Sequence, residues 1–259
     1  MSMRALLAAD AIPVGHFVFE FATPGIGYIA RNAGADYLIL DMEHSGFSFE
    51  TARLVVLSAR SAGLPLVVRV PSNDVKDLTR VGDIGADGVM APSVKSAEEA
   101  RAIVAGVKYA PDDRRGVVLA QMHDRFRVEP FAEKARRAND SNAVILLIET
   151  PEGVDAADAM AAIPGVDCLW IGHMDLSCAL GTPGEFDTPR FRECEATVMA
   201  AARRHGRRFG RLARNPEEGA ELASRGYDCL ALYTDTAVYQ AALTAGIGDL
   251  RKRLGETSK

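Results

Sequence analysis

Two carboxylates stand just past the ends of apolar runs in the sequence, where both could bind one metal ion. Glu149 ends the run VILLIE, and Asp175 follows CLWIG. In a parallel barrel, catalytic groups project from the carboxyl ends of the strands, so both side chains would reach one face. Carboxylates with no His or Cys at ligand spacing favour Mg²⁺ or Mn²⁺, with Co²⁺ as a further candidate, over zinc. The alternative is that each residue only caps the helix after it.

The segment DMEH, directly after the apolar run YLIL, offers a proton acceptor. Asp41 is predicted to orient the imidazole of His44 and to stabilise its charge, with Glu43 beside it. Such a pair of side chains acts as a general base. The alternative is a surface loop of mixed polar residues.

A cation interrupts a third apolar run. Arg69 lies in LVVRV, just before Pro71. Burying a guanidinium is costly unless it is paired, so we predict that Arg69 faces an enolate or a carboxylate of the substrate. The alternative is a structural salt bridge to Asp41 or Glu43. His173, in the turn before Asp175, could face the same site.

Eight apolar runs bounded by turn residues could position these side chains. Most are apolar throughout rather than alternating, which is typical of parallel strands covered on both faces. We predict strands over 14–20, 37–44, 65–70, 87–92, 143–149, 167–172, 207–212 and 228–235, of which 207–212 has the weakest pattern.

Helix-compatible segments separate these runs, and glycines end several of them, at Gly63, Gly85 and Gly206. Strands that alternate with helices indicate βαβ units. We therefore predict an α/β fold, a single (β/α)₈ TIM barrel over residues 1–259. A loop-rich insertion around 93–142 follows the fourth strand, and its loops are expected on the catalytic face. The last helix, 242–255, is expected to complete this single domain.

The composition narrows the classes of partner and compartment. The 259 residues are 48% hydrophobic, enough for a large core, and the net charge of -5 argues against nucleic acid. The basic cluster at 203–211 is interpreted as a solvated helix end leading into a strand. Four cysteines without paired spacing favour buried thiols and a reducing cytoplasm. No apolar stretch reaches the roughly 20 residues of a membrane helix, so no membrane partner is predicted.

Six further motifs carry a resemblance to a known family. They are LDMEH at 40–44, VRVPSND at 68–74, DIGADGVMAPSVKSAEEA at 83–100, RRGV at 114–117, IETPEG at 148–153 and IGHMDLS at 171–177. With these motifs the chain resembles the HpcH/HpaI aldolases, metal-dependent (class II) pyruvate aldolases, along almost its whole length. None of the eight apolar runs contains the lysine that a Schiff-base aldolase would need.

The resemblance implies reversible cleavage of a 4-hydroxy-2-oxo acid to pyruvate and an aldehyde, through a pyruvate enolate held on the metal. Glu149 and Asp175 would be the metal ligands, and Arg69 would stabilise the enolate oxygen. His44 would be the general base, supported by Glu43 as well as Asp41. Backbone amides near Met174 and Asp175 would receive the substrate carboxylate.

The resemblance also implies an assembly. Members are typically hexamers, trimers of dimers with an exchanged C-terminal helix, and Asp83 resembles an acid that reaches a neighbouring subunit's site. Two positions depart from the pattern: Leu147 replaces a glutamine two residues before the metal-binding Glu, and His173 replaces a proline. Both departures are expected to alter substrate preference, and His173 adds a titratable group.

Other functions remain open on the sequence. Oxaloacetate decarboxylation and cleavage of citramalyl-type or malyl-type CoA esters would use the same enolate. A CoA-ester lyase needs a basic groove, for which Arg114, Arg115, Arg125 and Arg127 are the candidates. An alternative of another class is a barrel that binds ketoacids without turnover.

Overall fold

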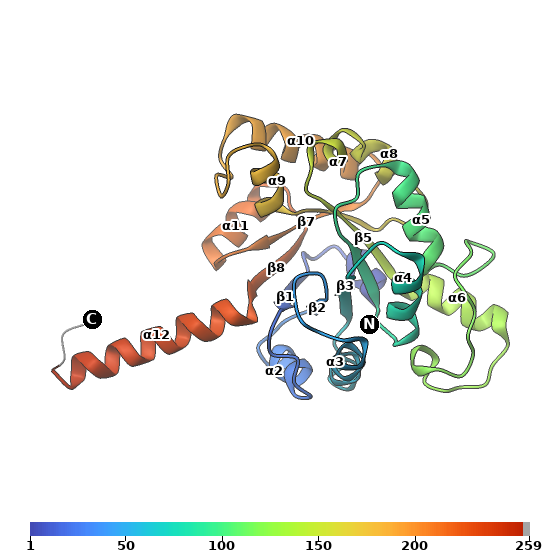
Figure 1. Cartoon of the computed structure of the whole chain (residues 1–259), viewed down its shortest axis with the longest axis horizontal. Helices are drawn as coiled ribbons and strands as arrows, with labels where there is room; N and C mark the ends of the chain where they lie inside the picture. The colour runs from blue at the N-terminus through green and yellow to red at the C-terminus, as the bar shows by residue number, and fades with distance from the viewer. Residues whose placement is uncertain (256–259) are drawn as a thin grey trace.

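The eight apolar segments pair in parallel in the order of the chain, and the last pairs with the first to close a barrel. The computed structural model describes residues 1–255 (Figure 1). The predicted barrel is confirmed, including the strand with the weakest pattern, which is β7. The strands are β1 (Val14–Val18), β2 (Tyr37–Asp41), β3 (Leu66–Arg69), β4 (Gly88–Ala91), β5 (Ala143–Ile148), β6 (Cys168–Ile171), β7 (Arg208–Ala213) and β8 (Cys229–Thr234).

Each strand contributes to two cores, because successive side chains point to opposite faces. In β2, Tyr37 and Ile39 lie in the barrel interior, while Leu38 and Leu40 pack with the outer helices. All four are fully buried. This double burial is why the strands are apolar at nearly every position.

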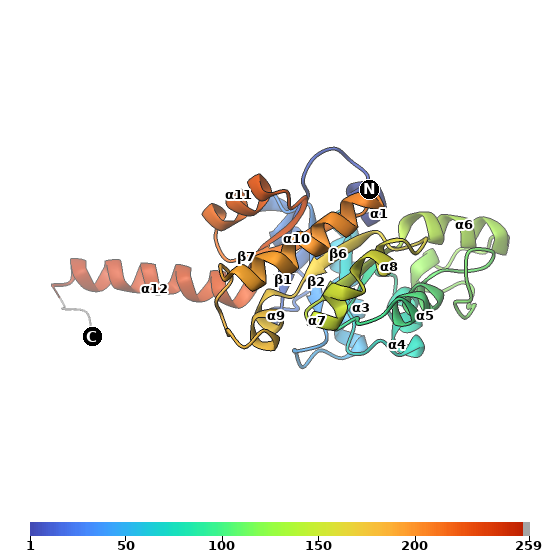
Figure 2. The same cartoon turned by 90° about the horizontal axis from the view of Figure 1, so that it is seen from above.

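Helices lie around the barrel, and Figure 2 shows this layer from above. The segment 151–163, which is helix-compatible in sequence, forms two short helices that meet at Ala156. Gly63, Gly85 and Gly206 have positive φ just beyond helix ends, as predicted. The helices are α1 (Met3–Leu7), α2 (Ile26–Asn32), α3 (Phe49–Ser61), α4 (Val75–Asp83), α5 (Ala97–Val107), the 3₁₀ helix η1 (Met122–Asp124), α6 (Phe131–Ser141), α7 (Pro151–Asp155), α8 (Ala157–Ala161), α9 (His173–Ala179), α10 (Pro189–Arg204), α11 (Pro216–Arg225) and α12 (Asp235–Arg253).

Four aspartates join neighbouring strands at the amino-terminal end of the barrel. Each directly precedes an even-numbered strand, and its carboxylate accepts a hydrogen bond from a main-chain N–H at the start of the preceding odd-numbered strand. Its own N–H donates to the carbonyl of that same residue. The four pairs are Asp36 with Val14, Asp87 with Leu66, Asp167 with Val144 and Asp228 with Phe209, at 2.9, 3.0, 2.9 and 2.6 Å for the carboxylate contact.

The insertion does not lie on the catalytic face, and that expectation is wrong. Helix α5 carries the chain back from the carboxyl end of β4 before the loop begins. Segment 108–130 therefore packs at the amino-terminal end of the barrel. There Arg115 pairs with Asp83 at the end of α4, at 2.7 Å, and Arg60 donates to the carbonyl oxygen of Met122, at 2.8 Å.

The last helix is longer than predicted, because α12 begins at Asp235 rather than at 242. Figures 1 and 2 show α12 projecting away from the barrel, which it meets at β1 and β8. Only Asp235 of this helix is buried. The rest of the helix therefore adds little to the core of its own barrel.

The remaining sequence predictions concern thiols, the basic cluster and membranes. Cys168 and Cys229 are buried and, like the other two cysteines, free, as expected for reduced thiols.

The basic cluster ends α10 and enters β7, but Arg211 is 1% exposed and pairs with Glu195 at 3.0 Å. Among residues 1–255, no helix combines the length and the apolar character that a membrane crossing requires.

The aspartate contacts predict a measurable share of the stability. Asp36→Ala is expected to lower the free energy of unfolding by roughly 1–3 kcal/mol, because it leaves an N–H of β1 without its charged acceptor. Asp36→Asn keeps an acceptor oxygen and should lose less. Urea-induced unfolding measures both, and an alanine variant as stable as the unsubstituted protein would contradict this role.

Candidate active site

Glu149, the residue after β5, lies almost fully buried at the carboxyl end of the barrel. Its Oε1 accepts hydrogen bonds from the N–H and the hydroxyl of Ser93, at 2.7 and 2.6 Å. A Cβ on Gly172 would lie 2.4 Å from Oε2, so only glycine leaves room for this carboxylate. Thr150, not Glu149, caps α7. The capping alternative is therefore wrong for Glu149.

Asp175 lies in the first turn of α9, after the end of β6. Gly172 precedes this helix and supplies no side-chain cap, so the first amides of α9 have no partner within the helix. Asp175 is not the capping residue, which excludes the second half of the capping alternative. A carboxylate in this position is favoured by the helix dipole.

Glu43, Glu149 and Asp175 form a cluster of acids that repel one another. Burial raises the pKa of Glu149, and the charges of Glu43 and Asp175 raise it further, against the lowering effect of the Ser93 hydroxyl. Burial also raises the pKa of Glu43, while Arg69 and His44 oppose that rise. The cluster therefore holds more negative charge than its protein partners compensate.

These acids suit a hard divalent cation. The Oε2 of Glu43 forms an ion pair with Arg69 at 3.2 Å but accepts no well-formed hydrogen bond among the described residues. In residues 1–255, no set of three or more His, Cys, Asp or Glu side chains is already arranged around a metal position. Mg²⁺ is commonly held by only one or two carboxylates, with water and substrate as the other ligands. The residues present fit such an ion.

Arg69 is the cation of the site. Its Nε donates to Asp41 at 2.6 Å, and its Nη1 lies 3.2 Å from Glu43, so the salt bridges considered as an alternative are present. Phe17 and Phe19 lie against the guanidinium, with ring centroids 5.6 and 5.5 Å from Cζ. Nη2 is left without a protein partner among residues 1–255.

His44 is held differently from the prediction. The carboxylate of Asp41 accepts the main-chain N–H groups of Glu43 and His44, at 3.1 and 3.0 Å, rather than a bond from the imidazole. The imidazole Nε2 instead lies 3.6 Å from Glu43, and the side chain is 59% exposed. Asp41 therefore shapes the loop, and Glu43 is the acid that faces the ring. These contacts fix the loop, although His44 itself lies largely at the surface, as the alternative of a surface polar loop supposed.

These side chains surround one cavity of about 190 Å³, which lies where β5 and β6 end. Leu147, His173 and Met174 line it, and their predicted contact with a substrate remains a prediction. Sequence reasoning missed the aromatic and aliphatic wall and the supports of Glu149. The missed residues are Phe17, Phe19, Trp170, Leu212, Gly172 and Ser93.

His173 does not titrate near neutral pH. Burial, with Arg211 and Arg214 nearby, lowers its pKa to about 3, so the ring is neutral. It lies edge-on to Phe186, with centroids 4.9 Å apart. The expectation of an added titratable group is therefore wrong, and His173 acts as a neutral polar wall.

Asp83 and the arginines of the insertion lie outside this cavity. Asp83 is at the amino-terminal end of the barrel, where it binds Arg115. Within one chain, neither Asp83 nor Arg115 contacts the cavity that Glu149 lines. Arg115 therefore cannot contribute to a CoA-binding groove at this cavity. The predicted contact of Asp83 with a neighbouring subunit's site remains a prediction.

Three comparisons identify what this chain is similar to. The model of the HpcH/HpaI aldolase/citrate lyase family matches residues 19–242. A 5-keto-4-deoxy-D-glucarate aldolase of Klebsiella pneumoniae is 31% identical over 252 residues, 96% of each chain. A 2-dehydro-3,6-dideoxy-6-sulfogluconate aldolase of Pseudomonas putida is 32% identical over 236 residues, 90% of each. The crystal structure of an HpcH/HpaI aldolase from Desulfitobacterium hafniense has a TM-score of 0.92 and 32% identity, covering 97% of each chain.

The acid cluster predicts a stability test that needs no substrate. In metal-free buffer, Glu149→Gln should unfold at a higher temperature than the unsubstituted protein, because the amide carries no charge to bury. A raised folded-state pKa means that ionisation destabilises the fold, so this gap should widen as the pH rises from the ordinary glutamate pKa to the raised one. Differential scanning calorimetry measures both.

Adding Mg²⁺ or Mn²⁺ should stabilise the unsubstituted protein and leave Glu149→Gln nearly unchanged. The exposed Glu185→Gln is the matched control and should respond like the unsubstituted protein. An equal response of Glu149→Gln would show that the cation binds elsewhere.

Proposed function

Because the chain belongs to the HpcH/HpaI aldolase/citrate lyase family, we propose that it cleaves a 4-hydroxy-2-oxo acid reversibly to pyruvate and an aldehyde. It is a carbon–carbon lyase, and the aldolases of this family are metal-dependent. The observation that carries the proposal is the convergence of Glu149, Asp175, Arg69 and His44 on one cavity.

Glu149 and Asp175 are the proposed metal ligands, with Mg²⁺ or Mn²⁺ as the ion. A bound divalent cation would draw electron density from the 2-oxo group and so stabilise negative charge there. Ser93 holds one oxygen of Glu149, which leaves Oε2 for the cation. The free amides at the start of α9, near Met174 and Asp175, are suited to receive the substrate carboxylate.

Arg69 is proposed to stabilise the enolate. Asp41 and Glu43 hold two of its nitrogens, which aims the remaining N–H groups of Nη2 at the cavity. A guanidinium fixed in this way supplies positive charge where the C2 oxygen becomes negative. The two phenyl rings beside it exclude water and so strengthen that interaction.

His44 is the proposed general base. In the cleavage direction, the C4 hydroxyl gives its proton to the imidazole, and the C3–C4 bond breaks. The electron pair of that bond forms the C2=C3 double bond, and the π pair of the C2 carbonyl moves onto its oxygen, which yields the aldehyde and the enolate of pyruvate. The imidazolium of His44 then returns its proton to C3, which gives pyruvate. Glu43 faces Nε2 and favours a proton there, which leaves Nδ1 as the acceptor.

The remaining walls are proposed to select the substrate. Leu147 and Met174 are apolar, and neutral His173 can exchange hydrogen bonds without adding charge. The carbon skeleton of the aldehyde would lie against Leu212 and the phenyl rings. This arrangement favours a 2-oxo acid held by its carboxylate at one end and packed at the other.

Exchange of the methyl protons of pyruvate in D₂O tests the chemistry without knowledge of the aldehyde. The protein with Mg²⁺ or Mn²⁺ should exchange these protons, and chelator should stop the exchange reversibly. His44→Ala should slow it by about 10²–10⁴-fold, the usual contribution of a general base. Proton NMR follows the loss of the methyl signal.

His205→Ala is the matched control, because His205 lies at the surface and pairs with Asp158 at 3.1 Å. It should exchange at the rate of the unsubstituted protein. Full exchange in a verified metal-free sample, or in His44→Ala, would defeat the assignment. No exchange with any metal would instead favour an oxaloacetate or CoA-ester substrate, or a barrel that only binds ketoacids.

The proposed assembly is a hexamer, a trimer of dimers in which α12 is exchanged between subunits. Beyond Tyr239, which packs on Phe21 with centroids 5.2 Å apart, an apolar stripe runs along α12 with helical spacing. Its members, all at least 44% exposed, are Leu243, Ile247, Leu250 and Leu254. On α2, next to β1, Tyr28 and Ile29 are 50% and 63% exposed. A second copy's α12 would cover such surfaces.

Charge on this stripe should break the assembly. Leu243→Glu with Leu250→Glu is expected to convert the oligomer to smaller species, because burying two carboxylates in an apolar contact is costly. Ala241→Glu, on the opposite face of α12, should leave the mass unchanged. Analytical ultracentrifugation measures the mass, and an unaltered oligomer in the double variant would contradict the exchange.

A further inference from the structure

A second and larger cavity, of about 380 Å³, lies at the other end of the barrel. Its walls include Pro65, Asp87 and Asn142, which directly precede β3, β4 and β5. The catalytic cavity is formed by residues in the carboxyl-terminal halves of strands and in the loops that follow them, so the two cavities lie at opposite ends. The insertion forms the outer wall of the second cavity.

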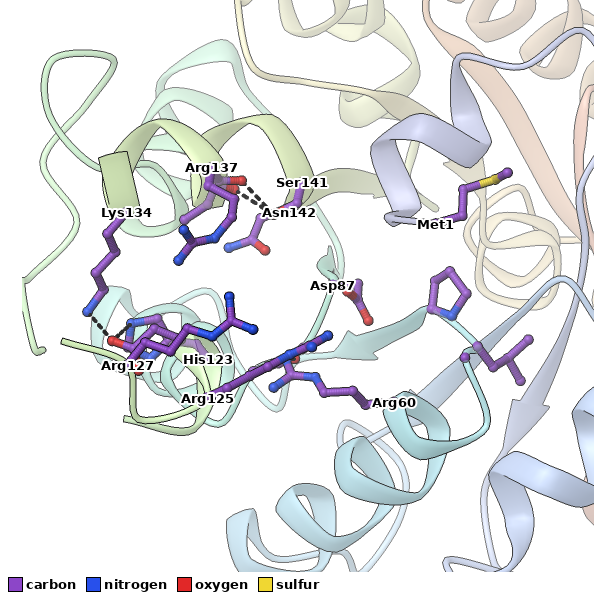
Figure 3. Close-up of a pocket in the computed structure, with 17 residues that line it drawn as sticks. Met1, Arg60, Asp87, His123, Arg125, Arg127, Lys134, Arg137, Ser141 and Asn142 are labelled. Atoms are coloured by element: carbon purple, nitrogen blue, oxygen red, sulfur yellow. Dashed lines mark hydrogen bonds and ion pairs between the residues drawn. The ribbon is translucent and has the colours of Figure 1, made fainter. Parts of the chain in front are cut away.

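Positive charge dominates this cavity. Figure 3 shows arginine side chains entering it from several elements, namely α3, the insertion and α6. Among residues 1–255, only two carboxylates line it, those of Asp87 and Asp124. The cationic residues are Arg60, Arg125, Arg127, Lys134 and Arg137.

Three of these cations have protein partners. Lys134 pairs with Asp124 at 2.8 Å, and Arg137 binds Glu129 through both Nη atoms. Arg60 donates to the carbonyl oxygens of Met122 and Gly85, at 2.8 and 2.6 Å, which satisfies its N–H groups without neutralising its charge.

Arg125 and Arg127 have no such partners. Neither side chain makes a hydrogen bond or an ion pair with another residue of the described part of the chain, although both main-chain N–H groups are bonded. Arg125 lies near enough to Arg60 to add to the burial that lowers the pKa of Arg60. Asp87 is the carboxylate that interacts with both Arg60 and Arg125, so the like charges in this concave surface are only partly compensated, and an anionic ligand would complete the compensation.

The backbone that presents Arg125 is itself strained. Arg125 and the next residue, Phe126, have φ of 57° and 59°, which non-glycine residues seldom adopt. The carboxylate of Asp124 accepts the N–H of Phe126 at 3.0 Å and so supports the turn. Such strain persists only where surrounding contacts enforce it, and it is concentrated at ligand sites.

We propose that this cavity binds a small polyanion, a phosphorylated or polycarboxylate metabolite, through Arg125 and Arg127 with Arg60 behind them. Guanidinium groups bind phosphate and carboxylate with paired, charge-assisted hydrogen bonds. The volume lies within the range of roughly 300–1,000 Å³ that is typical of small-molecule sites. The site is separate from the proposed catalytic centre and does not depend on the proposed reaction.

Isothermal titration calorimetry at constant ionic strength tests the proposal, with pyrophosphate, inorganic phosphate and citrate as separate probes. The intact oligomer should bind at least one of them, and the comparison shows whether phosphoryl or carboxylate groups are preferred. Arg125→Ala with Arg127→Ala should weaken that binding by about tenfold or more, the usual cost of losing a charge-assisted contact. Arg101→Ala, an exposed arginine of α5, is the matched control and should bind normally.

His123 gives an independent measurement on the unsubstituted protein. It lines the cavity, and burial, Lys134 and Arg115 lower its pKa. A bound anion should raise that pKa, which NMR of the imidazole resonances detects even if the double variant fails to fold.

Each of the other outcomes overturns the proposal. The first is no binding by any probe with no shift of His123, and the second is equal binding by the double variant. A change in oligomer mass without probe binding would assign the arginines to a partner subunit's acids. Loss of pyruvate exchange in a folded double variant of normal mass would assign them to a neighbouring catalytic site instead.

Discussion

Closure of the barrel depends on a repeated bond between a carboxylate and the main chain. Asp36, Asp87, Asp167 and Asp228 each hold one residue of the preceding strand by both its N–H and its carbonyl group. A parallel barrel allows only one relative shift of neighbouring strands if its last strand is to meet its first. These four contacts set the strand pairs at the amino-terminal end, and so they also determine which residues meet at the other end.

At that other end, the site is organised by unequal charge. Arg69 compensates Asp41 and Glu43, while Glu149 lies among acids with only the N–H and hydroxyl of Ser93 as donors. The same contacts that orient Arg69 therefore leave a net negative position beside it. The carboxylates there can bind a cation, and the guanidinium of Arg69 can bind an anionic substrate, while the barrel keeps its conformation.

The sequence predicted the parts of this protein that depend on local patterns. All eight strands, and the positions of Glu149, Asp175, Arg69 and His44 around one cavity, follow from apolar runs and the polar residues that end them. Contacts between distant segments left no such pattern. Ser93 contacts Glu149, which lies 56 residues later in the sequence. The only local signal for this contact was a hydroxyl-bearing residue just after β4. The insertion was predicted at the wrong end of the barrel, because its position depends on α5, which carries the chain back to the amino-terminal end before the loop begins.

The projecting helix has a consequence for how the molecule unfolds locally. Every strand precedes α12 in the chain, and β8 pairs with β1 while only Asp235 of the helix is buried. Closure of the barrel and ordering of α12 therefore depend on different contacts. Opening of this helix alone should cost little free energy, so its amide hydrogens should exchange much faster than those of the strands wherever no second surface covers it.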